Sequence, residues 1–405
     1  MAHPFLKSIK PVNLLSFGPN TEEIELRPLN ILIGPNGSGK SNFIEIIGLL
    51  KELPGKDPWS TVLETGGVDE WIWKGVSRNG SPVSQPSIEI SFEPHAAGQP
   101  VNYYQISLTK HAPTFSFHVH SEVLGQIDPT SKQRNAFYVN RIASNPDSAI
   151  VRSSVSSFAI SKAQRLDLRL SLLAQLVDVF NYPELYYLEQ KLSHISLYRD
   201  WVFGVAAEAR DPQPVGLDSI HLEEDTRNLA QVIKAMRDRG DQAIFDRLIH
   251  QLRTFYEPVK DIDVELVGTH LRIMIKEDGL SSRTPATRLS DGTLHWLTLL
   301  IVLLDPAPAP VVCIDEPELG LHPDVLPVLA DLLRDASTRT QLILTTHSRT
   351  LVECFSDDPE SVLVCEKFDG ATEIKRLESD RMKAWLEKYS LGQLWSSGEI
   401  GGNRW

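Results

Sequence analysis

Short runs of alternating apolar and polar residues open the chain. Between Phe5 and Ile33 the runs FLKSI, EIEL and NILI are separated by a turn at Gly18 to Asn20. A period of two is typical of strands, because successive side chains point to opposite faces. We therefore expect two antiparallel strands that lead into a buried strand ending at Ile33.

Helical spacing replaces the alternation directly after that strand. Apolar residues recur at Phe43, Ile46, Ile47 and Leu50, and Pro54 and Gly55 follow. This pattern predicts a helix from Gly39 to about Leu53.

Alternation returns at Ser87 and continues in three segments. The apolar positions are Ile88, Ile90 and Phe92, then Tyr104, Ile106 and Leu108, then Phe115, Phe117 and Val119. Such segments predict a three-stranded antiparallel meander with one buried face.

The middle of the chain is mainly helical in pattern. We expect helices over Leu166 to Val179, Tyr182 to Leu192, Glu223 to Arg239 and Asp241 to Phe255, a strand over Ser196 to Phe203, and a hairpin formed by the runs IDVELV and HLRIMIKE. The last two helices carry several arginines and lysines mixed with acids, which is typical of a solvated face; a nucleic-acid-binding strip is the alternative.

Apolar strands and helices alternate in the last third of the chain, as in α/β proteins. The motif LSDGT precedes an apolar helix that ends near Leu304. VVCIDE (Val311 to Glu316) and QLILTTHS (Gln341 to Ser348) predict buried strands, followed by further strands and a helix near Arg381 to Tyr389. The ending WSSGEIGGNRW is either a frayed tail or a docking peptide with exposed aromatic residues.

A glycine-rich turn joins the buried strand at Ile33 to the first helix. From Gly34 to Ser41 it reads G-x-x-x-x-G-K-S, which is a P-loop. Its glycines let backbone N–H groups curl around a phosphate at a helix N-terminus. Lys40 would reach the β- and γ-phosphates of a nucleotide, and the Ser41 hydroxyl would hold Mg²⁺.

Two carboxylates and a histidine follow the later apolar strands. Asp315, at a strand end, suits the carboxylate that holds Mg²⁺ through water, and Glu316 suits the general base that polarises the attacking water. His347, one strand further on, is placed to hydrogen-bond the γ-phosphate and its water. The residues thus predict hydrolysis of a nucleoside triphosphate.

The LSDGT motif offers a second anion site. By default a Ser-Asp-Gly turn before a helix is only an N-cap. An exposed hydroxyl at Ser290 and a close approach at Gly292 can also bind an anion at the helix N-terminus.

Taken together, GPNGSGKS, LSDGT, VVCIDEPELGLHP and TTHS resemble the Walker A, signature, Walker B with D-loop, and switch-histidine motifs of ABC-type ATPases. The segment EPELGLHP resembles the SMC/RecF-like and OLD-like branch. The resemblance implies a P-loop ABC ATPase head with a mixed central sheet, an antiparallel β meander and a compact helical lobe. It implies ATP and Mg²⁺ as ligands, and two copies that dimerise around two ATP molecules, the signature of one completing the P-loop site of the other.

Site residues follow from the same resemblance. The nucleotide-binding set is Asn36, Gly37, Ser38, Gly39, Lys40, Ser41, Asn42, Ser290 and Gly292. The catalytic set is Glu316, His347 and Gln175, and the metal set is Ser41, Asp315 and Gln175. Gln175 resembles the Q-loop glutamine that contacts metal and water, and Leu319 to His322 resemble the D-loop that crosses the dimer.

Two departures from the family narrow the expectation. Between Gln175 and Leu289 no sustained heptads occur, so we expect no long coiled-coil arms. About 60 residues follow His347, too few for a TOPRIM nuclease domain of ordinary size. We expect residues 1–175 and 286–405 to form the ATPase core and residues 176–285 an inserted, mainly helical lobe.

Composition limits the partners. The net charge of −13 argues against a surface that is basic all over, and the three cysteines are too few and too oddly spaced for a disulfide framework or zinc site. With no long apolar run, we expect a cytoplasmic protein without a membrane partner. The leading hypothesis is an ATP-gated homodimer that senses or clamps DNA and controls a separate effector or nuclease subunit, in DNA repair or anti-phage defence. The alternatives are a nucleotide-gated scaffold for a toxin or nuclease and the nucleotide-binding subunit of a transporter.

Overall fold

A computed structural model of the chain divides into two compact units. One unit comprises residues 3–195, 360–381 and 397–405, and the other comprises residues 1–2, 196–359 and 382–396. The structure describes residues 4–75, 85–95, 100–111, 113, 115–128, 130–131, 134–141, 149–151, 166–199, 201–202, 204, 207–217, 220–239 and 242–402. We refer to the unit that contains the predicted P-loop as the P-loop unit and to the other as the acidic-strand unit.

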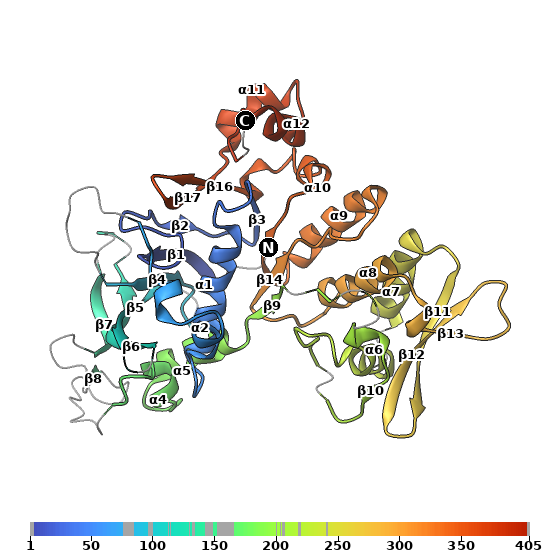
Figure 1. The fold of residues 1–405 in the computed structure, drawn as a ribbon, viewed down its shortest axis with the longest axis horizontal. Helices are drawn as coiled ribbons and strands as arrows, with labels where there is room; N and C mark the ends of the chain where they lie inside the picture. Colours follow the sequence, from blue (N-terminus) through green and yellow to red (C-terminus); the bar gives the residue numbers. More distant parts are fainter. Residues whose placement is uncertain are drawn as a thin grey trace. The chain divides into compact units, whose positions relative to one another are not determined.

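An antiparallel sheet dominates the P-loop unit (Figure 1). Its strands in spatial order are β2 (Ile24–Glu25), β1 (Leu6–Val12), β4 (Ser87–Phe92), β5 (Asn102–His111), β6 (Ser116–Ile127), β7 (Arg134–Arg141) and β8 (Ala149–Val151). The pairing of β1 with β2 and the meander β4 to β6 confirm the sequence predictions. Strands β7 and β8 extend the sheet beyond the predicted meander.

The P-loop follows a fully buried strand. Strand β3 (Leu29–Ile33) pairs in parallel with β16 (Val362–Phe368), which pairs antiparallel with β17 (Ala371–Arg376). Helix α1 (Lys40–Glu52) begins within the predicted motif. The remaining helices of this unit are α2 (Ser60–Glu64), α3 (Val68–Trp71), α4 (Leu172–Gln175) and α5 (Pro183–Ser193).

The acidic-strand unit contains three neighbouring parallel strands. In spatial order they are β9 (Ser196–Tyr198), β14 (Val311–Asp315) and β15 (Gln341–Thr345). The helices wholly within this unit are α6 (Leu229–Asp238), α7 (Gln242–Phe255), α8 (Asp291–Leu303), α9 (Leu326–Ala336) and α10 (Arg349–Glu353). Helix α8 is buried at every position from Thr293 to Leu303, as expected for a helix that is apolar all round.

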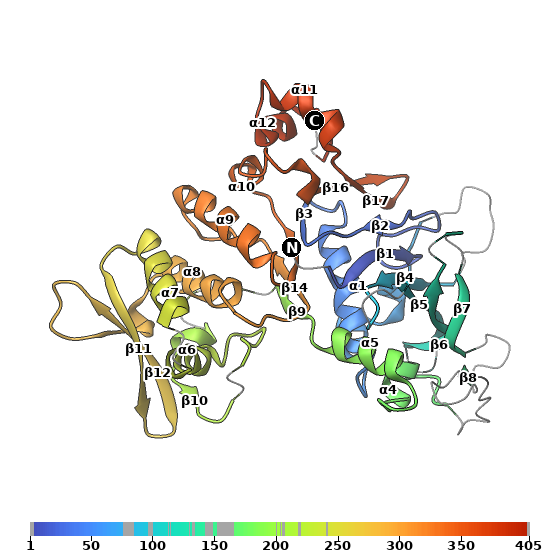
Figure 2. The ribbon, with the colours of Figure 1, turned by 180° about the vertical axis from the view of Figure 1, so that it is seen from behind.

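The predicted hairpin lies beside the two amphipathic helices. Strands β11 (Val259–Val267) and β12 (His270–Glu277) pair antiparallel, and the short strands β10 (Gln213–Pro214) and β13 (Thr284–Pro285) pair with β12. Figure 2, from behind, shows the same neighbours as Figure 1: α6 and α7 contact β11. Helices α11 (Ser379–Leu386) and α12 (Leu391–Ser397) follow near the end of the described chain.

The helix predicted over Leu166 to Val179 is wrong in extent, because only α4 forms there. Ser171 accepts a hydrogen bond from Ala174 N and so starts the helix late. Asp178 accepts hydrogen bonds from the backbone of Phe180 and Asn181, which favours a turn rather than continued helix.

The docking-peptide hypothesis for the chain's last residues rested on exposed aromatic residues. Trp395 is instead buried within α12. Residues 403–405, which include the last tryptophan, lie outside the described residues.

Candidate functional site

The P-loop is shaped by glycines in conformations that other residues rarely adopt. Gly37 has φ of 79° and Gly39 has φ of 106°. Only residues without a Cβ enter this region freely, and this lets consecutive N–H groups face one side of the turn. Asn36, Gly37 and Ser41 are exposed, whereas Ser38 and Gly39 are buried.

The side chain of Lys40 lies against the glycine turn and is shielded from solvent. It is only 5% exposed, and its ammonium group donates hydrogen bonds to Gly34 O at 2.8 Å and to Pro35 O at 3.3 Å. Burial of a lysine is rare unless the charge is satisfied. The ammonium is therefore fixed beside the glycine turn, where a phosphate would need it.

Thr372, which is distant in sequence, supports the loop through hydrogen bonds. Thr372 Oγ1, on β17, lies 2.8 Å from Ser38 O and 2.7 Å from Ser16 Oγ. A Cβ on Gly39 would come within 2.1 Å of Thr372 Oγ1. Sequence reasoning missed this contact of Thr372 with the P-loop, and we find no motif that signals it.

The loop residues fit a phosphate. Ser38 Oγ is buried and makes no hydrogen bond within the described structure, so the loop retains an unused polar group. The 13-residue helix α1 starts at Lys40 and presents its N-terminal N–H groups to the same turn. Asn42 is in the first turn of this helix.

The predicted acids and histidine meet at the carboxyl ends of two parallel strands. Asp315 ends β14 opposite Thr345, which ends β15, and the Thr345 hydroxyl donates to the Asp315 carboxylate. His347 Nε2 lies 3.7 Å from Glu316 Oε1. Asp315, Glu316 and His347 thus form one group within one unit.

Glu316 has an unusual backbone conformation. Its φ is 47°, in the left-handed region, which costs a residue with a side chain about 1–2 kcal/mol. The Glu316 N–H lies 3.2 Å from both Thr345 O and Thr345 Oγ1. Strain at a candidate catalytic residue supports a functional reason for the geometry.

Glu318 is a residue of the candidate site that sequence reasoning missed. Its Oε1 accepts hydrogen bonds from Thr346 Oγ1 at 2.6 Å, His347 N at 2.9 Å and Ser348 N at 3.1 Å. Burial raises the pKa of the Glu318 carboxyl above its usual value. This side chain holds the turn that carries His347. The signal was its place in the EPELGLHP segment, which sequence reasoning used only for the family resemblance.

The signature residues begin α8 as a capped helix. Ser290 Oγ accepts a hydrogen bond from Thr293 N at 3.1 Å, which is the N-cap geometry. Asp291 pairs with Arg210, and this hydrogen bond holds the pKa of the Asp291 carboxyl below its usual range. A Cβ on Gly292 would lie 2.9 Å from Gly320 O, so the helix start packs closely on the predicted D-loop. Anion binding at Ser290 and Gly292 stays a prediction.

Gln175 is engaged within its own segment. Its Nε2 donates to Leu170 O at 2.9 Å, Asp167 O at 3.1 Å and Ser171 O at 3.2 Å, and its Oε1 accepts from Asp167 N at 2.8 Å. In this arrangement the amide holds the turn before α4, and a contact with metal or water stays a prediction.

Metal ligation by the protein alone is not seen in the described parts of the chain, where no group of three or more His, Cys, Asp or Glu residues could hold an ion. Magnesium usually takes one or two protein ligands and completes its shell with phosphate and water. Ser41 and Asp315 are of the types that Mg²⁺ prefers.

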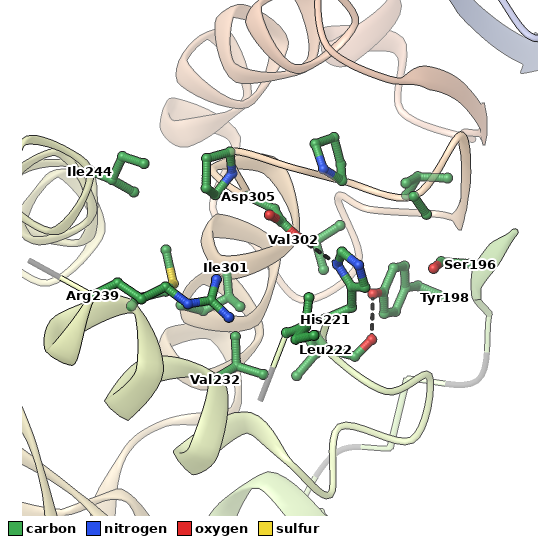
Figure 3. A pocket seen from close by; sticks show the side chains of 16 residues that line it. Ser196, Tyr198, His221, Leu222, Val232, Arg239, Ile244, Ile301, Val302 and Asp305 are labelled. Atoms are coloured by element: carbon green, nitrogen blue, oxygen red, sulfur yellow. Dashed lines mark hydrogen bonds and ion pairs between the residues drawn. The ribbon is translucent and has the colours of Figure 1, made fainter. Parts of the chain in front are cut away.

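A mostly apolar pocket in the acidic-strand unit is lined in part by residues of α6 and α8 (Figure 3). Its empty space of about 610 Å³ includes the open mouth, and Ile301 and Val302 line it from α8. His221 Nδ1 lies 3.0 Å from Asp305 Oδ2 at its wall. None of the predicted site residues lines this pocket.

His295 of α8 gives a prediction for stability. Burial lowers its pKa from 6.5 to about 4. The unfolded chain therefore binds a proton between pH 6.5 and 4 that the folded chain does not. The unfolding free energy is thus unaffected by protonation of His295 above pH 6.5 and decreases as the pH falls below that value. Relative to His295→Gln, the wild type should lose about 2 kcal/mol of unfolding free energy between pH 7.5 and 5. Urea titrations at both pH values measure this, and an equal loss in both proteins would contradict it.

The described part of the chain contains no helix that is long and apolar enough to cross a membrane.

Solved structures share this fold. The chain is similar to an SMC head bound to the C-winged helix domain of ScpA, with a TM-score of 0.57 and 16% identity over 94% of this chain and 100% of that one. It is also similar to an Smc head with an extended coiled coil, bound to the C-terminal domain of ScpA derived from Pyrococcus furiosus, with a TM-score of 0.52 and 16% identity over 95% of this chain and 99% of that one. At such identities the likeness shows the fold alone. No curated protein matches the chain.

The glycine loop before α1 and the acidic pair at the end of β14 lie on the fold of an SMC head, as the resemblance to SMC/RecF-like P-loop ATPases implied. The α/β class and the resemblance found in the sequence are thereby confirmed. The family model described as "AAA domain, putative AbiEii toxin, Type IV TA system" matches residues 29–97 and 185–353, more than half of the chain. The chain belongs to this family.

Proposed function

We propose that the protein binds ATP at the P-loop and hydrolyses it with Glu316 as the general base. The observation that carries the proposal is the meeting of Glu316 with His347, 3.7 Å apart, directly after the strand that ends in Asp315. A carboxylate polarises the attacking water, and a neighbouring imidazole can contact the γ-phosphate and orient that water.

The P-loop supplies the binding half of this proposal. The buried ammonium of Lys40 and the N–H groups at the start of α1 would contact the β- and γ-phosphates. Ser41 and Asp315 would hold Mg²⁺, which neutralises charge on the phosphates when bound. Gln175 would join them only after its amide leaves the hydrogen bonds of its own segment.

We further propose that two copies dimerise around two ATP molecules, with Ser290 and Gly292 of one copy contacting the ATP of the other. The fold likeness to SMC heads and the N-terminal position of both residues on α8 support this. Hydrogen bonds to a charged γ-phosphate contribute about 1.5–3 kcal/mol each, so a few of them across two sites can close a dimer. In this proposal residues 1–175 and 286–405 form the ATPase core.

The cycle of closing and opening would control a separate effector protein. Two of the similar SMC heads are bound to domains of ScpA, and the family's description refers to a toxin of a Type IV TA system. Both point to an ATPase head that acts through another protein, in defence or DNA repair. DNA is the trigger that the SMC likeness favours.

The test combines mass and turnover. In Mg²⁺-ATP the wild type should shift from monomer to dimer in mass photometry, and duplex or single-stranded DNA should change its steady-state turnover. Lys40→Ala, which removes the phosphate-binding ammonium, should remain monomeric. Absence of turnover would overturn the ATPase proposal, and absence of an ATP-dependent mass change would overturn the dimer. Turnover that ignores every form of DNA would reject the DNA trigger in favour of a protein.

A further inference from the structure

The segment after β14 is attached to helix α8 at two points. His295 Nε2 donates a hydrogen bond to Pro317 O at 3.0 Å, and both residues are well shielded from solvent. One turn earlier on the helix, a Cβ on Gly292 would meet Gly320 O at 2.9 Å. The helix that begins with Ser290 therefore packs directly on the loop that contains Glu316.

Trp201 adds a third attachment from the segment after β9. Its Nε1 donates to Asp315 O at 2.9 Å. Its ring meets the His295 ring edge to face, with 4.4 Å between centroids. The two aromatic side chains thus fix each other's orientation while each holds a different carbonyl of the same loop.

These contacts hold the backbone on both sides of Glu316. The carbonyl of Asp315 accepts from Trp201, the carbonyl of Glu316 accepts from Leu319 N at 3.0 Å, and the carbonyl of Pro317 accepts from His295. Three consecutive peptide planes are therefore fixed, and Glu316 sits among them with its left-handed φ of 47°. A conformation of this kind persists only where the surroundings hold it.

We propose that His295 and Trp201 are positioning residues that hold Glu316 in its working conformation and connect it to the helix that begins at Ser290. This rests on the function proposed above, in which Glu316 is the general base. In a dimer, when Ser290 of one copy contacts the ATP of the other copy, the contact would then affect the position of Glu316 in the copy to which that Ser290 belongs.

Substitutions at His295 separate the hydrogen bond from simple packing. His295→Leu fills the site with an apolar side chain of similar size that cannot donate to Pro317 O, whereas His295→Gln retains an N–H donor. Because small displacements of a catalytic group can cost up to about 100-fold in rate, we expect His295→Leu to lower kcat at least about tenfold, with KM for ATP changed less than about twofold. His295→Gln should recover most of the lost kcat, and Trp201→Phe should lower it as His295→Leu does.

Thr298→Val is the matched control. Thr298 lies one turn further along α8 and is equally buried, and its hydroxyl donates a hydrogen bond to Leu294 O of its own helix. Its kcat should match that of the wild type. An equal loss of kcat in Thr298→Val and His295→Leu would show that helix integrity alone matters and would overturn the proposal.

Hydrogen exchange separates this inference from the proposed function. The Leu319 amide donates to Glu316 O, so its exchange reports on the loop without any nucleotide. It should exchange at least about fivefold faster in His295→Leu than in the wild type or Thr298→Val. If the wild type does not hydrolyse ATP, the proposed function fails, and the exchange result alone decides whether His295 holds the loop. Unchanged exchange at Leu319 overturns the inference in either case.

Discussion

Glu316→Gln is expected to lower kcat for ATP hydrolysis by about 100-fold to 1,000-fold while leaving ATP binding intact. General acid–base groups contribute rate factors of about this size, and the neutral amide cannot accept a proton from water. The amide has nearly the same shape as the carboxylate, so it can occupy the same left-handed backbone position 3.7 Å from His347. Steady-state turnover and equilibrium titration with a fluorescent ATP analogue measure the two quantities.

The same variant should accumulate as the ATP-bound dimer, because hydrolysis is the step that releases the two copies. Glu353→Gln is the matched control: it makes the same chemical change at an exposed position in α10. It should retain wild-type turnover and a wild-type dimer lifetime. If Glu316→Gln kept full turnover, another group would have to serve as the base, and the assignment of Glu316 would be wrong.

Gly39→Ala is expected to be far more harmful than Gly37→Ala, although both residues have positive φ. A Cβ at Gly39 would lie 2.1 Å from Thr372 Oγ1 and 2.7 Å from Ser16 Oγ, whereas a Cβ at Gly37 would meet nothing within 4 Å. Overpacking costs about 1–3 kcal/mol and a left-handed Cβ about 1–2 kcal/mol. We therefore expect Gly39→Ala to lose about 2–5 kcal/mol of unfolding free energy and Gly37→Ala about 1–2 kcal/mol.

Urea titration without nucleotide measures both losses, since phosphate contacts then play no part. A double-mutant cycle with Thr372→Ala tests the cause. Removing the Thr372 hydroxyl and methyl should relieve part of the Gly39→Ala penalty, so the two losses should not add. Equal effects of the two glycine substitutions, or strict additivity with Thr372→Ala, would show that the close approach to Thr372 is not what constrains Gly39.

Local chemistry explains which parts of the site the sequence predicted. The glycine turn at Gly34 to Ser41 and the acids after β14 are signalled by adjacent residues, since a buried strand followed by glycines or carboxylates is a local pattern. The N-cap at Ser290 is also local, and the structure forms it. Alternation with a period of two identified the meander for the same reason.

Contacts between distant residues were beyond the sequence patterns. Thr372 reaches the P-loop across more than 300 residues, and His295 reaches Pro317 from inside an apolar helix, where a histidine gives no sign of its partner. The helix predicted near Gln175 failed because side chains such as Asp178 bond to the backbone in competition with helical bonds. Periodicity records which face is buried, and it does not record such pairings.

The support of the P-loop by Thr372 also determines when the nucleotide site can form during synthesis. Strand β3 is made long before its neighbour β16, and Thr372, the residue that supports its loop, is made 334 residues after Ser38. At translation rates of about 5–20 residues per second the interval is on the order of tens of seconds. During that interval a nascent chain carries the complete G-x-x-x-x-G-K-S motif without the strand and hydroxyl that shape it, and nucleotide binding should begin only once β16 and β17 are in place.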